Sequence, residues 1–339
     1  MNGRLEGELN KKTRVDKILE EMPEYVKKWV VTMRASNKTE STIFDYLGKV
    51  KTFLNYVNQK DDIANLPIEE ITPDITCDYF NTLKTTEKNG EIVETSDSYK
   101  ITNWYCLDNF LGFLTRRGYI SYNYMDDISK PKNKDLERIN MNRKKLTARD
   151  MSKLLKAVDT GAGTHRSRAR QMQWKERDKA ILALFIITGM RETALSQINI
   201  EDIDFEGNTL VVRDKRDKKF QYLLKDNIKK YIIDWINKRN ELVNDNTKTD
   251  ALFISNRRER LNAPGLQDIV YKYSQQALGF KISPHKLRAA FATILYDKNP
   301  DIYFVSKAIG HANIETTKRY IVTKNAEIDK AATIMDNVI

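Results

Sequence analysis

Apolar residues recur at steps of three and four through most of the first third of the chain, a spacing that gathers them on one face of an α-helix. The pattern predicts four amphipathic helices, over 22–36, 39–57, 73–83 and 104–117. Thr39 is the predicted N-cap of the second helix, Pro73 opens the third, and Gly118 ends the fourth. Four such helices joined by short links indicate a small all-α domain.

That domain is predicted to span residues 21–128, after a polar extension with a short helix over residues 1–20. Within it, segment 84–95, KTTEKNGEIVET, is predicted to be a loop. Beyond it the pattern changes, because residues 129–145 are polar, basic and almost free of large apolar side chains. They include Pro131 and are typical of an interdomain linker.

A second domain is predicted over 146–324. Its first helix begins at a pattern resembling a capping box, Thr147 followed by Asp150. The apolar run 178–189 predicts a buried helix ended by a glycine. Other predicted elements are a basic loop over 161–177, a β-hairpin with strands 208–214 and 219–225, a helix over 225–242 and a short strand over 251–255. The fold class is therefore mainly α (α+β), with a small antiparallel β-sheet.

Composition excludes several classes of protein. The chain has 339 residues, of which 40% are hydrophobic and 31% are charged. It therefore has enough hydrophobic residues to form the cores of two domains. The longest apolar run, 180–187, is far shorter than the roughly 20 residues of a membrane span. The first residues carry no apolar signal segment. Two cysteines, Cys77 and Cys106, form neither a disulfide framework nor a zinc site and are expected to be packing residues in a reducing cytoplasm.

The charge balance points towards a polyanionic partner. Lys and Arg number 58 against 47 Asp and Glu, which gives a net charge of +11. A basic chain without a lipid-binding pattern favours nucleic acid. A surface charge that serves solubility alone is the alternative.

Six residues in the second half could carry chemistry, although each has an ordinary explanation when taken singly. They are Arg191, Lys215, His285, Arg288, His311 and Tyr320. An arginine can cap a helix, a lysine can sit in any turn, a histidine can be structural and a tyrosine can pack in a core. As a set they share a theme, since arginine matches phosphate oxygens, tyrosine can be a covalent nucleophile and lysine can protonate a leaving alkoxide.

Two kinds of site are missing from the pattern. There is no cluster of carboxylates of the kind that Mg²⁺-dependent nucleases use, and no GxxxxGK[ST] phosphate cradle. The set therefore indicates attack on a phosphodiester without metal or nucleotide, and no cofactor is expected.

On these residues the chain resembles the tyrosine recombinases of the phage-integrase type. The elements that match are TGMR at 188–191, Lys215 in the hairpin turn, HKLR at 285–288, IGH at 309–311 and Tyr320. They occur in the family's order, with the tyrosine 9 residues beyond the histidine of the IGH element. Five coincident elements are far more specific than any one of them. In the N-terminal half the resemblance rests on helical pattern alone.

Two positions depart from the family's pattern. Ala194 stands where the family often has an acidic residue, and Ala289 stands where it often has a histidine. The IGH element also replaces the usual LGH. The first two changes concern groups that support the six principal residues rather than those residues themselves.

The resemblance implies a role for each principal residue. Tyr320 would attack the scissile phosphate to form a 3′-phosphotyrosyl link, and Arg191 and Arg288 would hold the non-bridging oxygens. His311 would donate a further hydrogen bond, His285 would assist proton transfer, and Lys215 would protonate the leaving 5′-oxygen. It also implies an N-terminal four-helix core-binding domain that clamps DNA and a mostly helical catalytic domain over 146–324.

Nine basic residues are candidates for contacts with DNA phosphates. They are Lys130, Lys132, Lys134, Arg143, Lys144, Lys145, Arg166, Arg168 and Arg170. A solvated basic linker and loop are the alternative. His165 lies in the same loop and is assigned no catalytic role.

The last segment, residues 325–339, has an apolar stripe at helical spacing. It either docks on the chain's own core or, as the resemblance implies, docks on a neighbouring subunit. The implied partners are a double-stranded DNA recombination site and a homo-tetramer in the synaptic complex, with a monomer or weak association without DNA. An accessory DNA-bending or directionality protein is left open.

The predicted function is site-specific DNA recombination, for integration, excision or resolution of DNA elements, by a cytoplasmic, nucleoid-associated enzyme. One alternative is a type IB topoisomerase, which shares the chemistry but relaxes supercoils. Another is a DNA-binding protein with a decayed site, against which the complete set of six residues argues.

Overall fold

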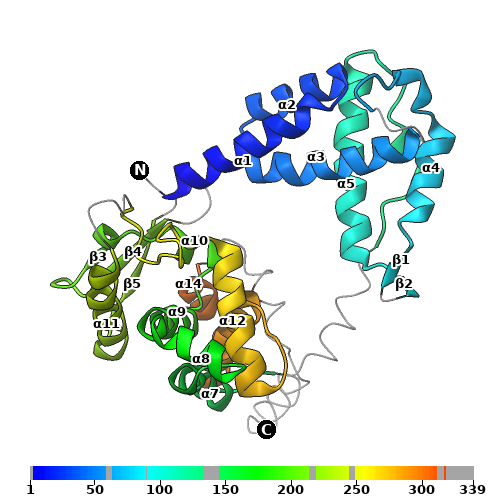
Figure 1. Ribbon diagram of the computed structural model, residues 1–339. Helices are drawn as coiled ribbons and strands as arrows, with labels where there is room; N and C mark the ends of the chain where they lie inside the picture. Colours follow the sequence, from blue (N-terminus) through cyan, green and yellow to red (C-terminus); the bar gives the residue numbers. More distant parts are fainter. Residues whose placement is uncertain are drawn as a thin grey trace, which may run out of the picture. The chain divides into compact units, whose positions relative to one another are not determined.

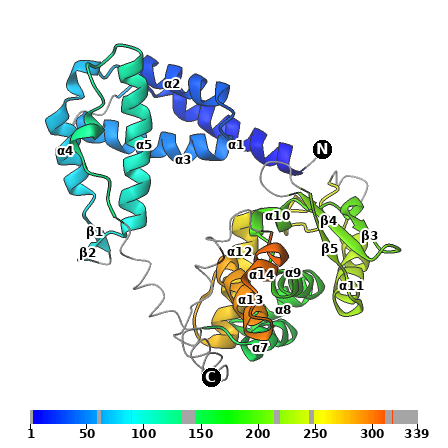
Figure 2. The ribbon, with the colours of Figure 1, turned by 180° about the vertical axis from the view of Figure 1, so that it is seen from behind.

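The structure, a computed structural model, describes residues 3–58, 63–88, 90–132, 145–213, 219–243, 249–310 and Thr317 (Figures 1 and 2). The chain divides into two compact units, and the boundary falls between Asn142 and Arg143. We refer to them as the N-terminal unit and the C-terminal unit, and each is described by itself.

The described part of the N-terminal unit holds five α-helices. They are α1 Gly3–Glu20, α2 Glu24–Ala35, α3 Glu40–Val57, α4 Pro73–Thr82 and α5 Asp97–Arg116, with 3-10 turns η1 Ile68–Glu70 and η2 Tyr124–Asp127. The apolar faces predicted from periodicity are buried, and their centre is aromatic. The Trp29 ring lies edge-on to Phe110 at 5.1 Å, and Phe53 lies 5.1 Å from Tyr79. All four predicted helices are present.

The predicted start signals also act as expected. The Thr39 side chain accepts a hydrogen bond from the backbone N–H of Thr42 and caps α3. Pro73 occupies the first turn of α4, where its missing N–H costs nothing. The Thr39 hydroxyl thus satisfies a backbone donor that has no partner inside the helix, and the proline removes one such donor.

Two N-terminal predictions were wrong in detail. The segment expected to be an extension with a short helix is an 18-residue helix, α1, whose Val15 is fully buried in the core of the unit. Segment 84–95, expected to be a loop, is an antiparallel hairpin of β1 Thr85–Lys88 and β2 Glu91–Glu94. Its strands face solvent, with Ile92 81% exposed, so they lack the apolar alternation that marks a half-buried strand.

The C-terminal unit is mostly helical with one small sheet. Its elements are α7 Ala148–Thr160, α8 His165–Met172, α9 Lys175–Thr188, α10 Glu192–Ser196, η3 Ile200–Asp202, β3 Ile203–Asp204, β4 Thr209–Arg213, β5 Lys219–Leu223, α11 Asp226–Leu242, α12 Ala263–Leu278, α13 Pro284–Lys298 and α14 Ile302–Ala308. The predicted capping box is present at the start of α7, where Thr147 and Asp150 bond each other's backbone N–H.

Helix α9 is the core element of this unit, as the apolar run predicted. It packs against α7, α11, α12 and α13, and its residues from Ala180 to Phe185 are all buried (Figures 1 and 2). An apolar helix that is buried all round needs no polar face. Because the helix is held on all sides, the residues at its two ends are held in place as well.

The three strands form an antiparallel sheet in the order β3-β4-β5. The predicted hairpin is confirmed, with Val211 opposite Gln221. Along β4, Leu210 and Val212 point to the core while their neighbours are half-buried. This alternation fixes the register of the strand, since a slip by one residue would expose both side chains.

Two predictions for the C-terminal unit were wrong. The stretch expected to be a basic loop contains the eight-residue helix α8, whose start is capped by Thr164. Its sequence has no apolar face, so helical periodicity could not reveal it. The expected strand over 251–255 makes only isolated bridges, Asn199 with Ala251 and Ile254 with Arg260.

Candidate active site

The TGMR element turns the chain sharply at the end of α9. Gly189 closes the helix with φ 59°, in the left-handed region that favours glycine. Thr188 stabilises the turn, because its hydroxyl donates to the Leu184 carbonyl at 2.6 Å and accepts from the Met190 N–H. Met190 is buried, and Arg191 follows, half-buried, as the N-cap residue of α10. The buried helix thus places the first arginine at a defined point.

Glycine at position 189 is required on two counts. Besides its positive φ, a Cβ at this position would lie 2.6 Å from the ring of Phe291 on α13. The close approach of α13 to the end of α9 therefore depends on the missing side chain.

The Gly189→Ala variant is expected to destabilise the protein by about 2–4 kcal/mol, from the left-handed backbone and from overpacking against Phe291. Gly279→Ala is the matched control, because Gly279 caps α12 in the same left-handed conformation with nothing within 4 Å of its Cβ position. Urea unfolding of the full chain should show a smaller loss for the control. Equal losses would contradict the close packing at Phe291.

Arg288 joins two segments that carry other predicted catalytic residues. It lies on α13, only 2% exposed, one turn after His285. Its guanidinium donates to the Gly189 carbonyl at 2.7 Å and to the Ile309 carbonyl at 2.5 Å. The first carbonyl lies two residues before Arg191, and the second lies two residues before His311. One buried side chain therefore ties the TGMR, HKLR and IGH elements together.

His285 is exposed in the first turn of α13, next to the Ser283 N-cap. Its exposure excludes the explanation of a histidine buried in the core. Because residues three apart share a helix face, His285 stands above Arg288 on the solvent side. This position leaves the imidazole accessible to a ligand.

The β4–β5 hairpin lies against the IGH element. A Cβ on Gly310, which has φ 67°, would lie 3.2 Å from the Phe220 ring of β5. Along the chain, Phe220 comes five residues after Lys215, and Gly310 directly precedes His311. The two flanking segments are thus in van der Waals contact.

Of the six predicted catalytic residues, Arg191, His285 and Arg288 lie in the described part of the chain. Lys215, His311 and Tyr320 lie outside the described residues. Arg288 bonds the Gly189 carbonyl, two residues before Arg191, and shares α13 with His285. Three of the phosphate-contact candidates, Lys134, Arg143 and Lys144, also lie outside the described residues.

The remaining basic candidates are placed as follows. Lys130 lies over the Tyr105 ring and bonds its hydroxyl, whereas Lys132 and Lys145 are exposed. Helix α8 carries Arg166, Arg168 and Arg170, all exposed. His165 is also exposed, in the first turn of α8.

Sequence reasoning overlooked a carboxylate beside the first arginine. Glu192 begins α10, is half-buried, and burial raises its pKa. Ala194, where the family often has an acid, is buried. The signal for Glu192 was its place directly after Arg191.

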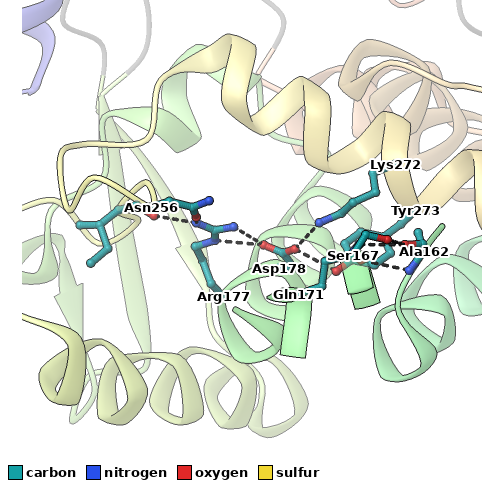
Figure 3. Close-up of polar contacts among 9 residues, drawn as sticks. Ala162, Ser167, Gln171, Arg177, Asp178, Asn256, Lys272 and Tyr273 are labelled. Atoms are coloured by element: carbon teal, nitrogen blue, oxygen red, sulfur yellow. Dashed lines mark hydrogen bonds and ion pairs between the residues drawn. The ribbon is translucent and has the colours of Figure 1, made fainter. Parts of the chain in front are cut away.

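A second overlooked feature is the buried Asp178 near the start of α9 (Figure 3). Its carboxylate accepts two hydrogen bonds from Arg177 at 2.8 and 3.0 Å, one from Lys272 at 2.8 Å and one from Tyr273 at 2.9 Å. Burial, with the nearby carboxylate, raises the pKa of Tyr273, so its phenol remains a donor. Asp178 thereby fixes α12 against the start of α9.

The Asp178→Asn variant is expected to lose about 3–5 kcal/mol of stability, because it leaves the buried Arg177 and the half-buried Lys272 without their counter-charge. Asp159→Asn is the matched control: Asp159 pairs with Lys175 and Lys179, but its side chain is 41% exposed. Such surface pairs contribute about 1 kcal/mol or less. Urea midpoints of the two variants measure the difference, and a loss for Asp178→Asn no larger than that of the control would contradict a structural role for the buried pair.

The cysteines behave as packing residues where the structure describes them. Cys106 is fully buried, and burial raises its pKa to about 12. Cys77 is half-buried and free. Among the described residues, no helix is long and apolar enough to cross a membrane. In that same part of the chain, no three His, Cys, Asp or Glu side chains are grouped to hold a metal ion.

Comparison with known proteins gives this geometry a family. The profile described as "Phage integrase family" matches residues 144–327, more than half of the chain. The chain belongs to the phage integrase family. The resemblance predicted from the motifs is therefore confirmed, and all six principal residues of this integrase-family chain lie inside the matched range.

Individual proteins similar to this chain are tyrosine recombinases. Tyrosine recombinase XerS of Streptococcus thermophilus is 25% identical over 344 residues, covering 94% of this chain and 96% of the relative. Tyrosine recombinase XerC of Caldanaerobacter subterraneus subsp. tengcongensis is 32% identical over 230 residues, covering 66% of this chain and 59% of the relative.

Solved structures share the fold. The XerH site-specific recombinase bound to palindromic difH substrate superposes with a TM-score of 0.66 at 21% identity, covering 97% of this chain and 89% of that one. A lambda integrase dimer bound to a COC′ core site gives a TM-score of 0.60 at 17% identity, covering 87% and 93%. The mainly helical fold with small antiparallel sheets is thus that of the tyrosine recombinases.

Proposed function

We propose that this integrase-family chain is a site-specific recombinase that cleaves and rejoins DNA through a 3′-phosphotyrosyl intermediate. The observation that carries the proposal is the position of Arg288, whose buried guanidinium holds the Gly189 and Ile309 carbonyls. That arrangement brings the segments leading to Arg191 and His311 to one place. Two arginines and a histidine there can neutralise the charge that develops on a phosphate during attack.

In the proposed reaction, Tyr320 attacks the scissile phosphorus and the 5′-hydroxyl leaves. Arg191 and Arg288 hold the non-bridging oxygens, and His311 donates a further hydrogen bond. His285 assists proton transfer, and Lys215, from the segment between β4 and β5, protonates the leaving oxygen. The phosphotyrosyl link conserves the energy of the phosphodiester, so rejoining needs neither metal nor ATP.

We further propose that the helical N-terminal domain, residues 21–128, and the catalytic domain, residues 146–324, clamp duplex DNA with the linker 129–145 between them. Solved relatives include a lambda integrase tetramer bound to a Holliday junction. By analogy, four subunits pair two DNA sites, and residues 325–339 dock on a neighbouring subunit. The reaction takes place in the cytoplasm, on nucleoid DNA.

The test uses a nicked suicide substrate that carries the bound site, mapped first by footprinting. Cleavage near the nick releases a short fragment, so rejoining fails and the covalent protein–DNA adduct accumulates. A denaturing gel should show the adduct without added metal or nucleotide. No adduct on DNA that the protein binds would contradict the proposed function. Adduct formation with supercoil relaxation and no exchange between two sites would favour a topoisomerase.

A further inference from the structure

The C-terminal unit has a basic cavity at the start of α9, the opposite end of the helix from Arg191. Its volume is ≈ 410 Å³, within the range of roughly 300–1,000 Å³ found for ligand pockets. The lining comes from α8, the link between α8 and α9, α9, the end of α11, α12 and the turn over 255–259. The residues that matter for its chemistry are Arg170, Arg177, Asp178, Asn256, Arg258 and Lys272, four of which are drawn in Figure 3.

The charges around the cavity do not balance. Four of the lining residues are cations, and Asp178 is the single acid that lines it. The Asp178 carboxylate already accepts four hydrogen bonds, which is about its full capacity. The cavity therefore keeps an excess of three positive charges and favours an anion.

Two of the cations have donors to spare. The Arg177 guanidinium is committed to Asp178 and the Ile254 carbonyl and lies 4.4 Å from the Trp174 ring. In contrast, the guanidinium groups of Arg170 and Arg258 make no hydrogen bond or ion pair with any residue that the structure describes. Both are exposed at the cavity. A planar fork of free donors matches the oxygens of a phosphate.

The elements that carry these two arginines are held firmly. Gln171, next to Arg170, bonds both the N–H and the carbonyl of Ala162, at 3.0 and 2.8 Å. Arg258 has φ 62°, uncommon for a residue with a side chain, in a turn closed by its N–H donating to the Ser255 carbonyl. Fixed backbones reduce the ordering cost of binding.

A larger cavity in the N-terminal unit, with a volume of ≈ 890 Å³, differs from this one in its charge. There Lys84 and Lys100 face Glu94 and Asp127, and Lys100 pairs with Glu94 at 3.0 Å. Its charges balance, so it offers no surplus for an anion. The excess of cations is a property of the cavity in the C-terminal unit.

We infer that the guanidinium groups of Arg170 and Arg258 together bind one phosphate of the DNA backbone, and that this phosphate is not the scissile one. The cavity lies at the start of α9 and Arg191 follows its end, and the two ends are roughly 16 Å apart along the helix at 1.5 Å per residue from Asp178 to Gly189. A single phosphate cannot reach both. The inference rests on the proposed function, because it takes DNA as the polyanion, and it assigns the cavity to positioning the duplex.

The test measures how salt weakens the binding of a short fluorescent duplex of arbitrary sequence. In the Arg170→Ala/Arg258→Ala double variant, the slope of log affinity against log salt should fall in magnitude by about 0.9, the value for one phosphate. The control is Arg149→Ala/Arg257→Ala, which removes the same charge from two exposed positions of the same unit that do not line the cavity. Its slope should stay near that of the wild type. Circular dichroism should confirm that both variants fold.

Equal changes in the two double variants, or no change in either, would overturn the inference. A second arm titrates deoxyadenosine monophosphate and inorganic phosphate into the protein without DNA. Saturable binding that the Arg170→Ala/Arg258→Ala variant loses would make the cavity a small-ligand site and would also overturn it. The nicked-substrate assay separates the two hypotheses, because adduct formation by the wild type upholds the proposed function whatever the salt slope shows.

Discussion

The Tyr320→Phe variant is expected to bind duplex DNA as the wild type does and to form no covalent adduct. The change removes one oxygen atom, which is the proposed nucleophile, and leaves an aromatic ring of the same size. The measurement is the nicked-substrate gel, read beside a binding isotherm on the same DNA. The expected adduct signal is below detection, because no other oxygen at that position can attack the phosphorus.

The control for this variant is Tyr303→Phe. Tyr303 lies on α14, which leads into the IGH element, and is 57% exposed, so it is another accessible phenol on the same part of the chain. Its loss should leave the adduct intact. If Tyr303→Phe abolished the adduct and Tyr320→Phe did not, the assignment of the nucleophile from the spacing after His311 would be wrong.

The Arg288→Ala variant is expected to cleave DNA about 10³-fold more slowly than the wild type, or worse. It removes one of the two cations proposed to stabilise charge on the phosphate, and charged donors of this kind contribute effects of that size. It also releases the Gly189 and Ile309 carbonyls, so the segments leading to Arg191 and His311 lose their shared partner. The rate constant for adduct formation, at saturating protein, is the quantity to measure.

A buried arginine elsewhere in the same unit separates catalysis from folding. Arg239 on α11 is 4% exposed and donates to two carbonyls, those of Ala251 at 3.0 Å and Thr249 at 2.8 Å. Arg239→Ala should therefore cost comparable stability while the folded fraction keeps a cleavage rate near that of the wild type. Similar losses of rate in the two variants would mean that Arg288 acts only by holding the fold.

Helices with an apolar face were readable from the sequence, and those without one were not. Periodicity located α2 and α3 because burial demands apolar residues at fixed steps, and a continuous apolar run located α9. Helix α8 is polar all round and is held by its cap, by Ser167 bonding the Ala162 and Thr164 carbonyls, and by Gln171. These are contacts of single polar side chains, which leave no periodic signal.

The hairpin β1–β2 was missed for a related reason. Both strands are exposed, so nothing in their composition distinguishes them from a loop. The available signal was the Asn-Gly pair at 89–90 between two short runs, a dipeptide that favours tight hairpin turns, and Gly90 does have φ 83°. Turn chemistry would have predicted the hairpin where apolar alternation could not.

For the site, the motifs identified the candidate residues and their order along the chain but not the contact that joins their segments. Arg288 and Gly189 are 99 residues apart, and the hydrogen bond between them involves a main-chain oxygen that every residue type possesses. A pattern of side chains cannot predict a partner that is a main-chain carbonyl. The buried Asp178 escaped notice likewise, because an Arg-Asp pair before an apolar run reads as an ordinary polar helix start.

Main-chain oxygens also hold Arg288 at its second contact, on Ile309. Since the bond is to the carbonyl, the side chain at that position matters only through its packing against Val305 and Ala292. Isoleucine and leucine bury similar volumes, so an exchange between IGH and LGH alters neither the bond nor the reach of the guanidinium. Position 309 can therefore accept other branched aliphatic residues. Gly189, whose carbonyl binds the same guanidinium, cannot be replaced without strain.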